Sequence, residues 1–227
     1  DSSLGITGQA AAQGGAVVVT GGTSATSANA GGAASLVGGT PGATGIGGAA
    51  TLQGAAGGAT SGDGGDAAVT GGAATANNDD GGDVVLTAGA AHGSGAAGVV
   101  LVRSKQLLPQ GAPTAKTVSA TLTAAEVLAG IITVNQAAGA SSAQQLPVAA
   151  DMDTAFPSSA AGDSFDFSVI NTSTVDAEDA SVTTNTGWTL VGNMDIHAYS
   201  AAGSLNSSAR FRARKTGTAA WTLYRIS

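Results

Sequence analysis

The chain contains no cysteine, and its basic and aromatic residues are few and unevenly placed. Eight Lys and Arg residues and eight aromatic residues occur among 227, and all of them lie at or after Arg103. The missing cysteine excludes disulfides, thiol nucleophiles and zinc–cysteine sites. The net charge of −7 argues against nucleic acid as a partner, because phosphate binding requires clustered Lys and Arg.

Long apolar runs are also missing. No stretch of 18 apolar residues occurs, and no basic, hydrophobic leader opens the chain, so we expect no membrane-spanning helix and no membrane partner. The mean hydropathy of +0.21 is nevertheless too high for an ordinary disordered chain, which combines low hydrophobicity with high net charge. The chain must therefore bury surface somewhere.

The composition divides the chain into two halves. Residues 1–102 hold six carboxylates and no Lys, Arg, Phe, Tyr or Trp, whereas the remainder holds eight basic and nine acidic residues. We predict a stalk over residues 1–103, a connector over 104–116 that contains Pro109 and Pro113, and a separate domain over 117–227.

Glycine pairs recur at a nearly constant interval in the first half. The five residues that follow each opening pair, as in 16–20 or 83–87, predict a short strand, and a second small pair comes next. The fourth and sixth positions of each unit are Val, Ala or Leu, and they share one face of such a strand. The opening pairs are Gly14-Gly15, Gly31-Gly32, Gly47-Gly48, Gly64-Gly65 and Gly81-Gly82, at spacings of 17, 16, 17 and 17.

Two inward side chains per unit cannot sustain an isolated repeat. A repeat with so few core residues needs stacked neighbours and other chains around the same axis. We therefore predict a β-solenoid or a trimeric β-helix-like stalk within a homotrimer. Glycine suits this arrangement because a close approach of two backbones leaves no room for a Cβ atom.

Other interpretations of the first half are weaker. A flexible linker would not carry columns of Val and Leu, and collagen needs glycine at every third position. Residues 62–68 match a calcium-binding repeat once only, so structural calcium stays open. No Gly-Lys-Ser or Gly-Lys-Thr follows any glycine-rich loop, which excludes the usual phosphate-binding motif.

The second half alternates apolar and polar residues over short segments. Within 164–170, Phe165, Phe167 and Val169 share one face, and Thr123 with Glu126 forms a capping box ahead of a short helix. A second short helix is expected between Pro147 and Pro157. These patterns predict an antiparallel β-sandwich with one or two short helices, so the whole chain is expected to be all-β. The other expected strands are 117–122, 131–135, 181–185, 188–191, 195–200, 209–215 and 219–226.

Residues able to carry chemistry are sparse. His92 and His197 are far apart in sequence, and neither has neighbours at the spacing of metal ligands. Asp163 and Asp166 could form an acid pair, but pairing with arginine is the simpler role. We therefore predict no catalytic residue, no cofactor and no metal ligand, and hence no enzyme.

One basic stripe stands out. Arg210, Arg212 and Arg214 alternate with small or apolar residues along a predicted strand and so share one face of it. Such a face is usually solvated or paired across the sheet. Together with Trp188 and Trp221, these arginines are the candidate partner-contact residues.

Several segments carry a resemblance to a known family. They are 122–128, the Leu146-Pro147 step with its Ala-rich helix, 161–171 with the string GDSFDF, 211–217 with the string FRARKTG, and 221–225. They resemble the C-terminal domain of structural proteins of tailed bacteriophages, such as capsid-decorating and head-fibre proteins. The glycine-rich repeat resembles the stalks of the same proteins.

This resemblance implies a trimeric structural protein on the surface of the phage virion, most simply on the head. Its partners would be its own copies and capsid or other virion proteins. The alternative is a receptor-binding tail fibre or adhesin that recognises a host surface polysaccharide. Exposed aromatic side chains over a groove would favour the adhesin, whereas buried ones would favour a scaffold. A glycan-cleaving enzyme would need a carboxylate pair in a cleft, which the glycine-rich half cannot build.

Overall fold

The computed structural model of the 227-residue chain divides into two compact units, Asp1–Val102 and Arg103–Ser227. It describes residues 17–25, 30–41, 43–44, 46–57, 59–75, 80–137, 139–199 and 206–227. The first predicted glycine pair, Gly14-Gly15, lies outside these residues.

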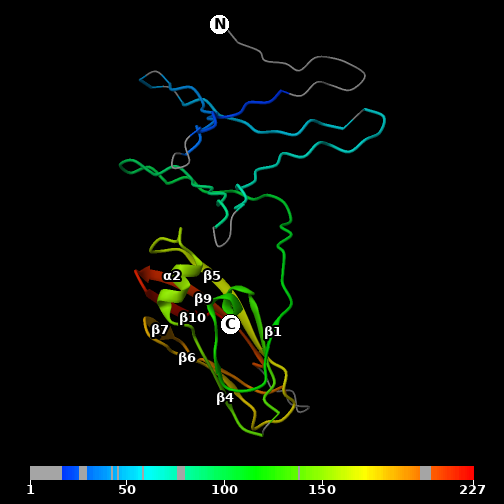
Figure 1. Ribbon diagram of the computed structural model, residues 1–227, viewed down its shortest axis with the longest axis vertical. Helices are drawn as coiled ribbons and strands as arrows, with labels where there is room; N and C mark the ends of the chain where they lie inside the picture. The colour runs from blue at the N-terminus through cyan, green and yellow to red at the C-terminus, as the bar shows by residue number, and fades with distance from the viewer. Residues whose placement is uncertain are drawn as a thin grey trace. The chain divides into compact units, whose positions relative to one another are not determined.

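In the first unit, the five-residue segments expected to be strands are not strands. None of the described residues from 17 to 113 belongs to a helix or a strand. The chain runs instead as a succession of loops (Figure 1). A strand exists only when a neighbour pairs with its backbone groups, and the single chain places no such neighbour beside these segments.

The second unit is mostly β-sheet with two short helices, in agreement with the predicted β-rich character. Its described strands form a six-stranded sheet, in the order β1-β3-β5-β9-β10-β7, and a four-stranded sheet, in the order β2-β4-β6-β8. The helices are α1 (Ala124–Leu128) and α2 (Ala149–Ala155). The strands are β1 (Thr114–Lys116), β2 (Ala120–Thr121), β3 (Ile131–Val134), β4 (Ser142–Gln145), β5 (Ser164–Asn171), β6 (Ala180–Thr183), β7 (Trp188–Val191), β8 (Asp195–Ile196), β9 (Ser208–Gly217) and β10 (Ala220–Arg225).

The predicted antiparallel arrangement is wrong for most of the unit. From β1 to β9 the chain changes sheet after every strand, and up to β7 it returns to each sheet in the same direction. Strands β1, β3 and β5 therefore lie parallel, as do β2, β4 and β6, and β7 lies parallel to β10. Antiparallel pairing joins β5 to β9, β9 to β10, and β6 to β8.

One hydrophobic core takes side chains from both sheets and both helices. Phe167 and Phe211 from the larger sheet, Val182 and Ile196 from the smaller, and Met152 of α2 are all at most 2% exposed. Burial alternates most regularly along β9, where Ala209, Phe211 and Ala213 are buried. This alternation places the intervening residues of β9 on the outer face of the sheet.

Three local features predicted for the second unit are confirmed: a capping box, the bounds of one strand and a hairpin. The Thr123 hydroxyl accepts a hydrogen bond from the Glu126 N–H, and the Glu126 carboxylate accepts one from the Thr123 N–H, which confirms the capping box. Strand β7 has the predicted bounds, and β9 and β10 form the predicted hairpin. The end of the expected connector differs, because residues 114–116 form β1 and pair with β3.

Candidate self-association surface and arginine row

The chain of the first unit crosses itself at pairs of small residues. At each crossing the N–H of one glycine donates to a carbonyl oxygen nine or ten residues earlier, at 2.7–2.9 Å. Each bond joins the end of one five-residue segment to the start of the next, so the residues between them form a closed loop. The donor and acceptor pairs are Gly32 and Gly22, Gly48 and Gly39, Gly65 and Ala55, Gly82 and Gly72, and Gly98 and Gly89.

Glycine is required on one side of four of these crossings. A Cβ atom on Gly21, Gly38, Gly54 or Gly71 would lie 1.8–2.0 Å from the carbonyl oxygen of the glycine across the crossing. The neighbouring glycines Gly22, Gly39 and Gly72 would meet nothing within 4 Å. Only the last crossing has alanine at this position, Ala88. The close backbone approach that the glycines predict is therefore present, and it occurs within one chain.

Large aliphatic side chains of the first unit are left uncovered. Every described Val, Leu and Ile between residues 17 and 102 is at least 47% exposed. A monomeric soluble protein rarely exposes apolar side chains in such number and regularity, and exposed apolar surface usually marks an interaction site. The exposed set is Val17, Val18, Val19, Leu36, Val37, Ile46, Leu52, Val69, Val84, Val85, Leu86, Val99, Val100, Leu101 and Val102.

The arginine row lies where the alternation predicted it, on the outer face of β9. Asp166 on β5 lies directly opposite Arg212. Its carboxylate accepts hydrogen bonds from Arg212 Nε at 2.7 Å and Nη2 at 2.9 Å, and from Arg210 Nη2 at 2.6 Å. These bonds, chiefly those from Arg212, lower the pKa of Asp166. Among the described residues, Arg214 has no hydrogen-bond or ion-pair partner.

We expect Asp166→Asn to lower the free energy of unfolding of the second unit by about 1 kcal/mol at neutral pH, because both arginines are largely exposed and solvent screens the pairing. Since the folded-state pKa of Asp166 is lowered, the carboxylate stabilises the fold above its unfolded pKa of about 4 and loses this effect as the pH falls. Urea unfolding followed by tryptophan fluorescence at pH 7 and pH 3 measures the difference. Asp176→Asn, in an exposed loop, is the control, and an equal loss at both pH values would contradict this role.

The two tryptophans do not lie where partner contact would require. Trp188 is 8% exposed and Trp221 is 2% exposed. Their rings pack with centroids 6.0 Å apart. The Trp188 Nε1–H donates to the Pro147 carbonyl, and the Trp221 Nε1–H donates to the Asp153 carboxylate. Both indoles belong to the core, because their rings pack against each other and each ring N–H donates to an acceptor inside the unit. The sequence alone could not distinguish this core position from a position on the surface.

A further group of polar and ionisable residues lines a hollow of the second unit. Ser141, Asp179, Ser181, Asp195 and His197 line a shallow hollow of about 240 Å³, in which His197 Nδ1 lies 3.1 Å from Asp179 Oδ2. No group of His, Asp or Glu in the described part of the chain has the geometry to hold a metal ion. Nor does any described helix have the length and apolarity needed to cross a membrane.

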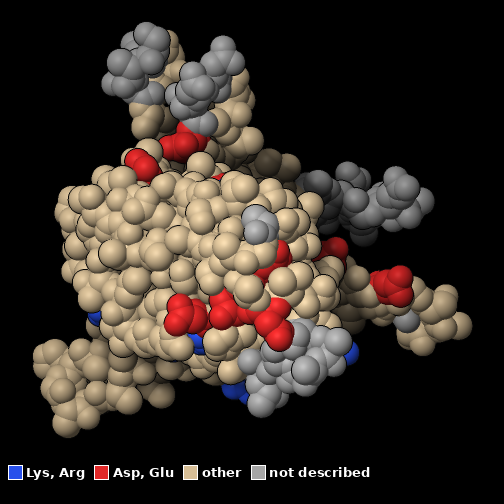
Figure 2. Space-filling view, turned by 90° about the horizontal axis from the view of Figure 1, so that it is seen from below, with Lys and Arg blue, Asp and Glu red and all other residues tan. Residues whose placement is uncertain are grey.

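The surface charge is unevenly distributed. Figure 2 shows a row of acidic side chains and only a few basic ones on the face that it displays. In comparisons with known proteins, no family model, curated protein or solved structure matches the chain.

Proposed function

We propose that this chain is a structural protein of a tailed-bacteriophage virion, a trimeric fibre or decoration protein without catalytic activity. One observation supports it most: the second unit packs large apolar side chains into a buried core, whereas the first unit exposes all fifteen of its described Val, Leu and Ile residues. Exposed apolar side chains of this kind are expected to be buried against a partner. Other copies of the chain carry the same repeat, so their apolar side chains recur at matching intervals.

In this proposal the stalk becomes a β-helix-like fibre only when copies combine. The five-residue segments then find strand partners on neighbouring chains, and the glycine crossings keep the loops between them closed. Three copies are the number that the resemblance to phage fibres implies. The second unit, with two sheets around one core, is the sandwich-like domain at the end of the fibre, and capsid or other virion proteins are the further partners at the particle surface.

The alternative is a tail fibre or adhesin that recognises a host surface polysaccharide. The exposed arginine row favours it, because guanidinium groups bind carboxylate and phosphate groups of anionic glycans. The buried tryptophans count against it, since aromatic rings stacked on sugars must reach the surface. Tyr199, at 57% exposure, is the most exposed described aromatic residue. The structural proposal therefore has the better support.

Light scattering on the purified full chain tests the proposal. We expect a mass close to three times the 21.3 kDa of one chain, unchanged on dilution into the nanomolar range. A mass near that of a single chain would contradict it. An array of glycans carrying carboxylate or phosphate groups tests the alternative, and binding that Arg214→Ala abolishes would favour the adhesin.

A further inference from the structure

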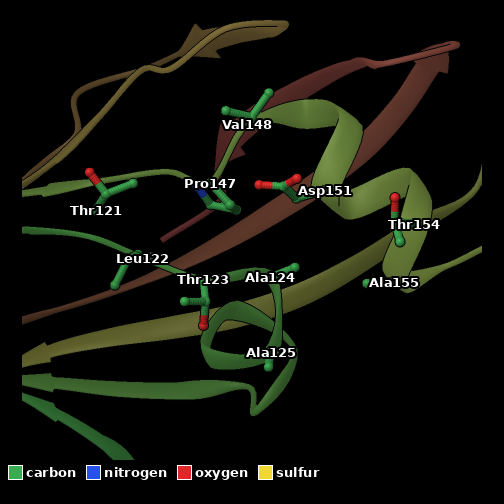
Figure 3. Close-up of a pocket in the computed structure, with 10 residues that line it drawn as sticks. All are labelled: Thr121, Leu122, Thr123, Ala124, Ala125, Pro147, Val148, Asp151, Thr154 and Ala155. Atoms are coloured by element: carbon green, nitrogen blue, oxygen red, sulfur yellow. The ribbon is translucent and has the colours of Figure 1, made fainter. Parts of the chain in front are cut away.

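A mostly apolar groove opens beside the two helices of the second unit. Its volume is about 640 Å³, within the range of pockets that hold a small ligand or several side chains. One wall is the segment from β2 into α1, and the other is the segment from β4 into α2 (Figure 3). The lining residues are Thr121, Leu122, Thr123, Ala124, Ala125, Pro147, Val148, Asp151, Thr154 and Ala155.

Asp151 is the one charged residue of this lining. Figure 3 shows its carboxylate projecting from α2 toward the space between the two walls. Among the described residues no hydrogen bond or ion pair engages this carboxylate. The groove therefore offers an apolar floor with a single unpaired negative charge at its side.

A segment of the same chain has the complementary chemistry. The connector carries Lys105, just after Arg103, followed by Leu107 and Leu108, which are 98% and 75% exposed. Neither Arg103 nor Lys105 has a partner in the described part of the chain. Two adjacent leucines so fully exposed, beside two unpaired cations, match an apolar groove with one unpaired carboxylate.

The connector is held next to α1 but does not fill its own groove. The Gln110 side-chain amide donates to the Ala129 carbonyl, at the C-terminal end of α1, at 2.5 Å. Pro109 restricts Leu108 to extended conformations, which favours an extended path away from this anchor. Leu107 is left 98% exposed in the single chain.

We propose that the connector of one copy docks in the groove of a second copy. Leu107 and Leu108 occupy the apolar floor beside Leu122 and Val148, and Lys105 pairs with Asp151. The proposal rests on the self-association proposed above, because copies joined through their repeats bring their connectors together. It adds a second interface, in which each C-terminal domain is held by the chain of a neighbour.

Cysteine cross-linking in the full chain tests this arrangement, because the natural sequence has no cysteine. Chains carrying Leu107→Cys are co-expressed with chains carrying Val148→Cys and then mildly oxidised. We expect a covalent heterodimer on a non-reducing gel. The matched control replaces Val148→Cys by Val191→Cys, since Val191 is 44% exposed against 36% for Val148 and lies outside the groove. The control pair is expected to cross-link at least ~10-fold less.

A charge exchange tests the ion pair separately. Asp151→Lys places two cations together, so we expect the cross-linking yield to fall about threefold at low salt, and adding Lys105→Asp in the partner restores it. If the yield with Val148→Cys equals the control while light scattering shows a trimer, the inference is wrong and the proposed function stands. A single-chain mass overturns both. A disulfide formed only within chains carrying both cysteines would mean that the connector fills its own groove, which also overturns the inference.

Discussion

Replacing Asp153 by alanine is expected to lower the free energy of unfolding of the second unit by about 3 kcal/mol. The Asp153 carboxylate on α2 accepts hydrogen bonds from the Ala219 N–H at 2.7 Å and from the Trp221 Nε1–H at 2.9 Å. It also lies 3.0 Å from Lys215 Nζ, and Lys215 is only 9% exposed. One side chain therefore ties the helix to both strands of the β9–β10 hairpin.

The size of this effect follows from what the substitution leaves behind. Lys215 would keep its charge in a nearly buried position, with only the Ser159 hydroxyl at 3.0 Å and the Trp221 ring, 5.9 Å from the centroid, as neighbours. The turn residue Ala219 has a φ of +47°, a strained conformation for a residue with a Cβ. The Asp153 carboxylate accepts a hydrogen bond from the Ala219 N–H, so replacing Asp153 also removes a bond that holds this turn.

The same contacts predict an acid dependence. The hydrogen bond from the Ala219 N–H, together with those from Trp221 and Lys215, lowers the pKa of Asp153 in the folded chain. A lowered folded pKa means that the stabilisation is complete above the unfolded pKa of about 4 and is lost as the pH falls below it. The difference between the natural chain and Asp153→Ala should therefore shrink between about pH 4 and pH 2.

Urea unfolding monitored by tryptophan fluorescence measures both effects, because Trp188 and Trp221 lie in this unit. Asp176→Ala removes a carboxylate that has no partner among the described residues, and it should change stability by less than ~0.5 kcal/mol. A loss of stability as small as that of this control would show that Asp153 does not hold the hairpin.

The sequence predicts local structure in the second unit better than strand direction. The capping box depends only on Thr123 and Glu126, three residues apart, so it is visible in the chain itself. The alternation of Phe165, Phe167 and Val169 likewise gives the inner face of β5. Strand direction depends on which strands become neighbours. β1 pairs directly with β3, although β2, which follows β1 in sequence, belongs to the other sheet. Nothing local to either segment specifies that.

The candidate sites show the same limit. The spacing of Arg210, Arg212 and Arg214 predicted a shared face. Charge alone predicted arginine pairing for Asp166, which is confirmed, and for Asp163, which is wrong because its carboxylate accepts the Ala160 N–H instead. The sequence could not assign Trp188 and Trp221 to the core or to the surface, because an aromatic residue on a short strand can face either side of its sheet. The groove was missed, since its walls come from two helices that are 20 or more residues apart in sequence.

The glycine crossings support the second large prediction. Gly38→Ala places a Cβ atom 1.8 Å from the Gly48 carbonyl oxygen and 2.6 Å from its carbonyl carbon. Both neighbours are backbone atoms, so the crossing must open, and the hydrogen bond from the Gly48 N–H to the Gly39 oxygen is lost with it. We expect a cost of about 2–4 kcal/mol per chain, the range typical of severe local strain.

Gly39→Ala is the matched control, because a Cβ atom on Gly39 meets nothing within 4 Å. Both variants lose a glycine from the same pair, so they share any change in the entropy of the unfolded chain. In hydrogen exchange measured by mass spectrometry, peptides that contain Gly48 should lose protection in Gly38→Ala and keep it in Gly39→Ala. If the crossings hold the loops in place for assembly, only Gly38→Ala should also lower the mass measured by light scattering. Equal behaviour of the two variants would mean that the glycine pairs serve flexibility and that the loops are closed by something other than these crossings.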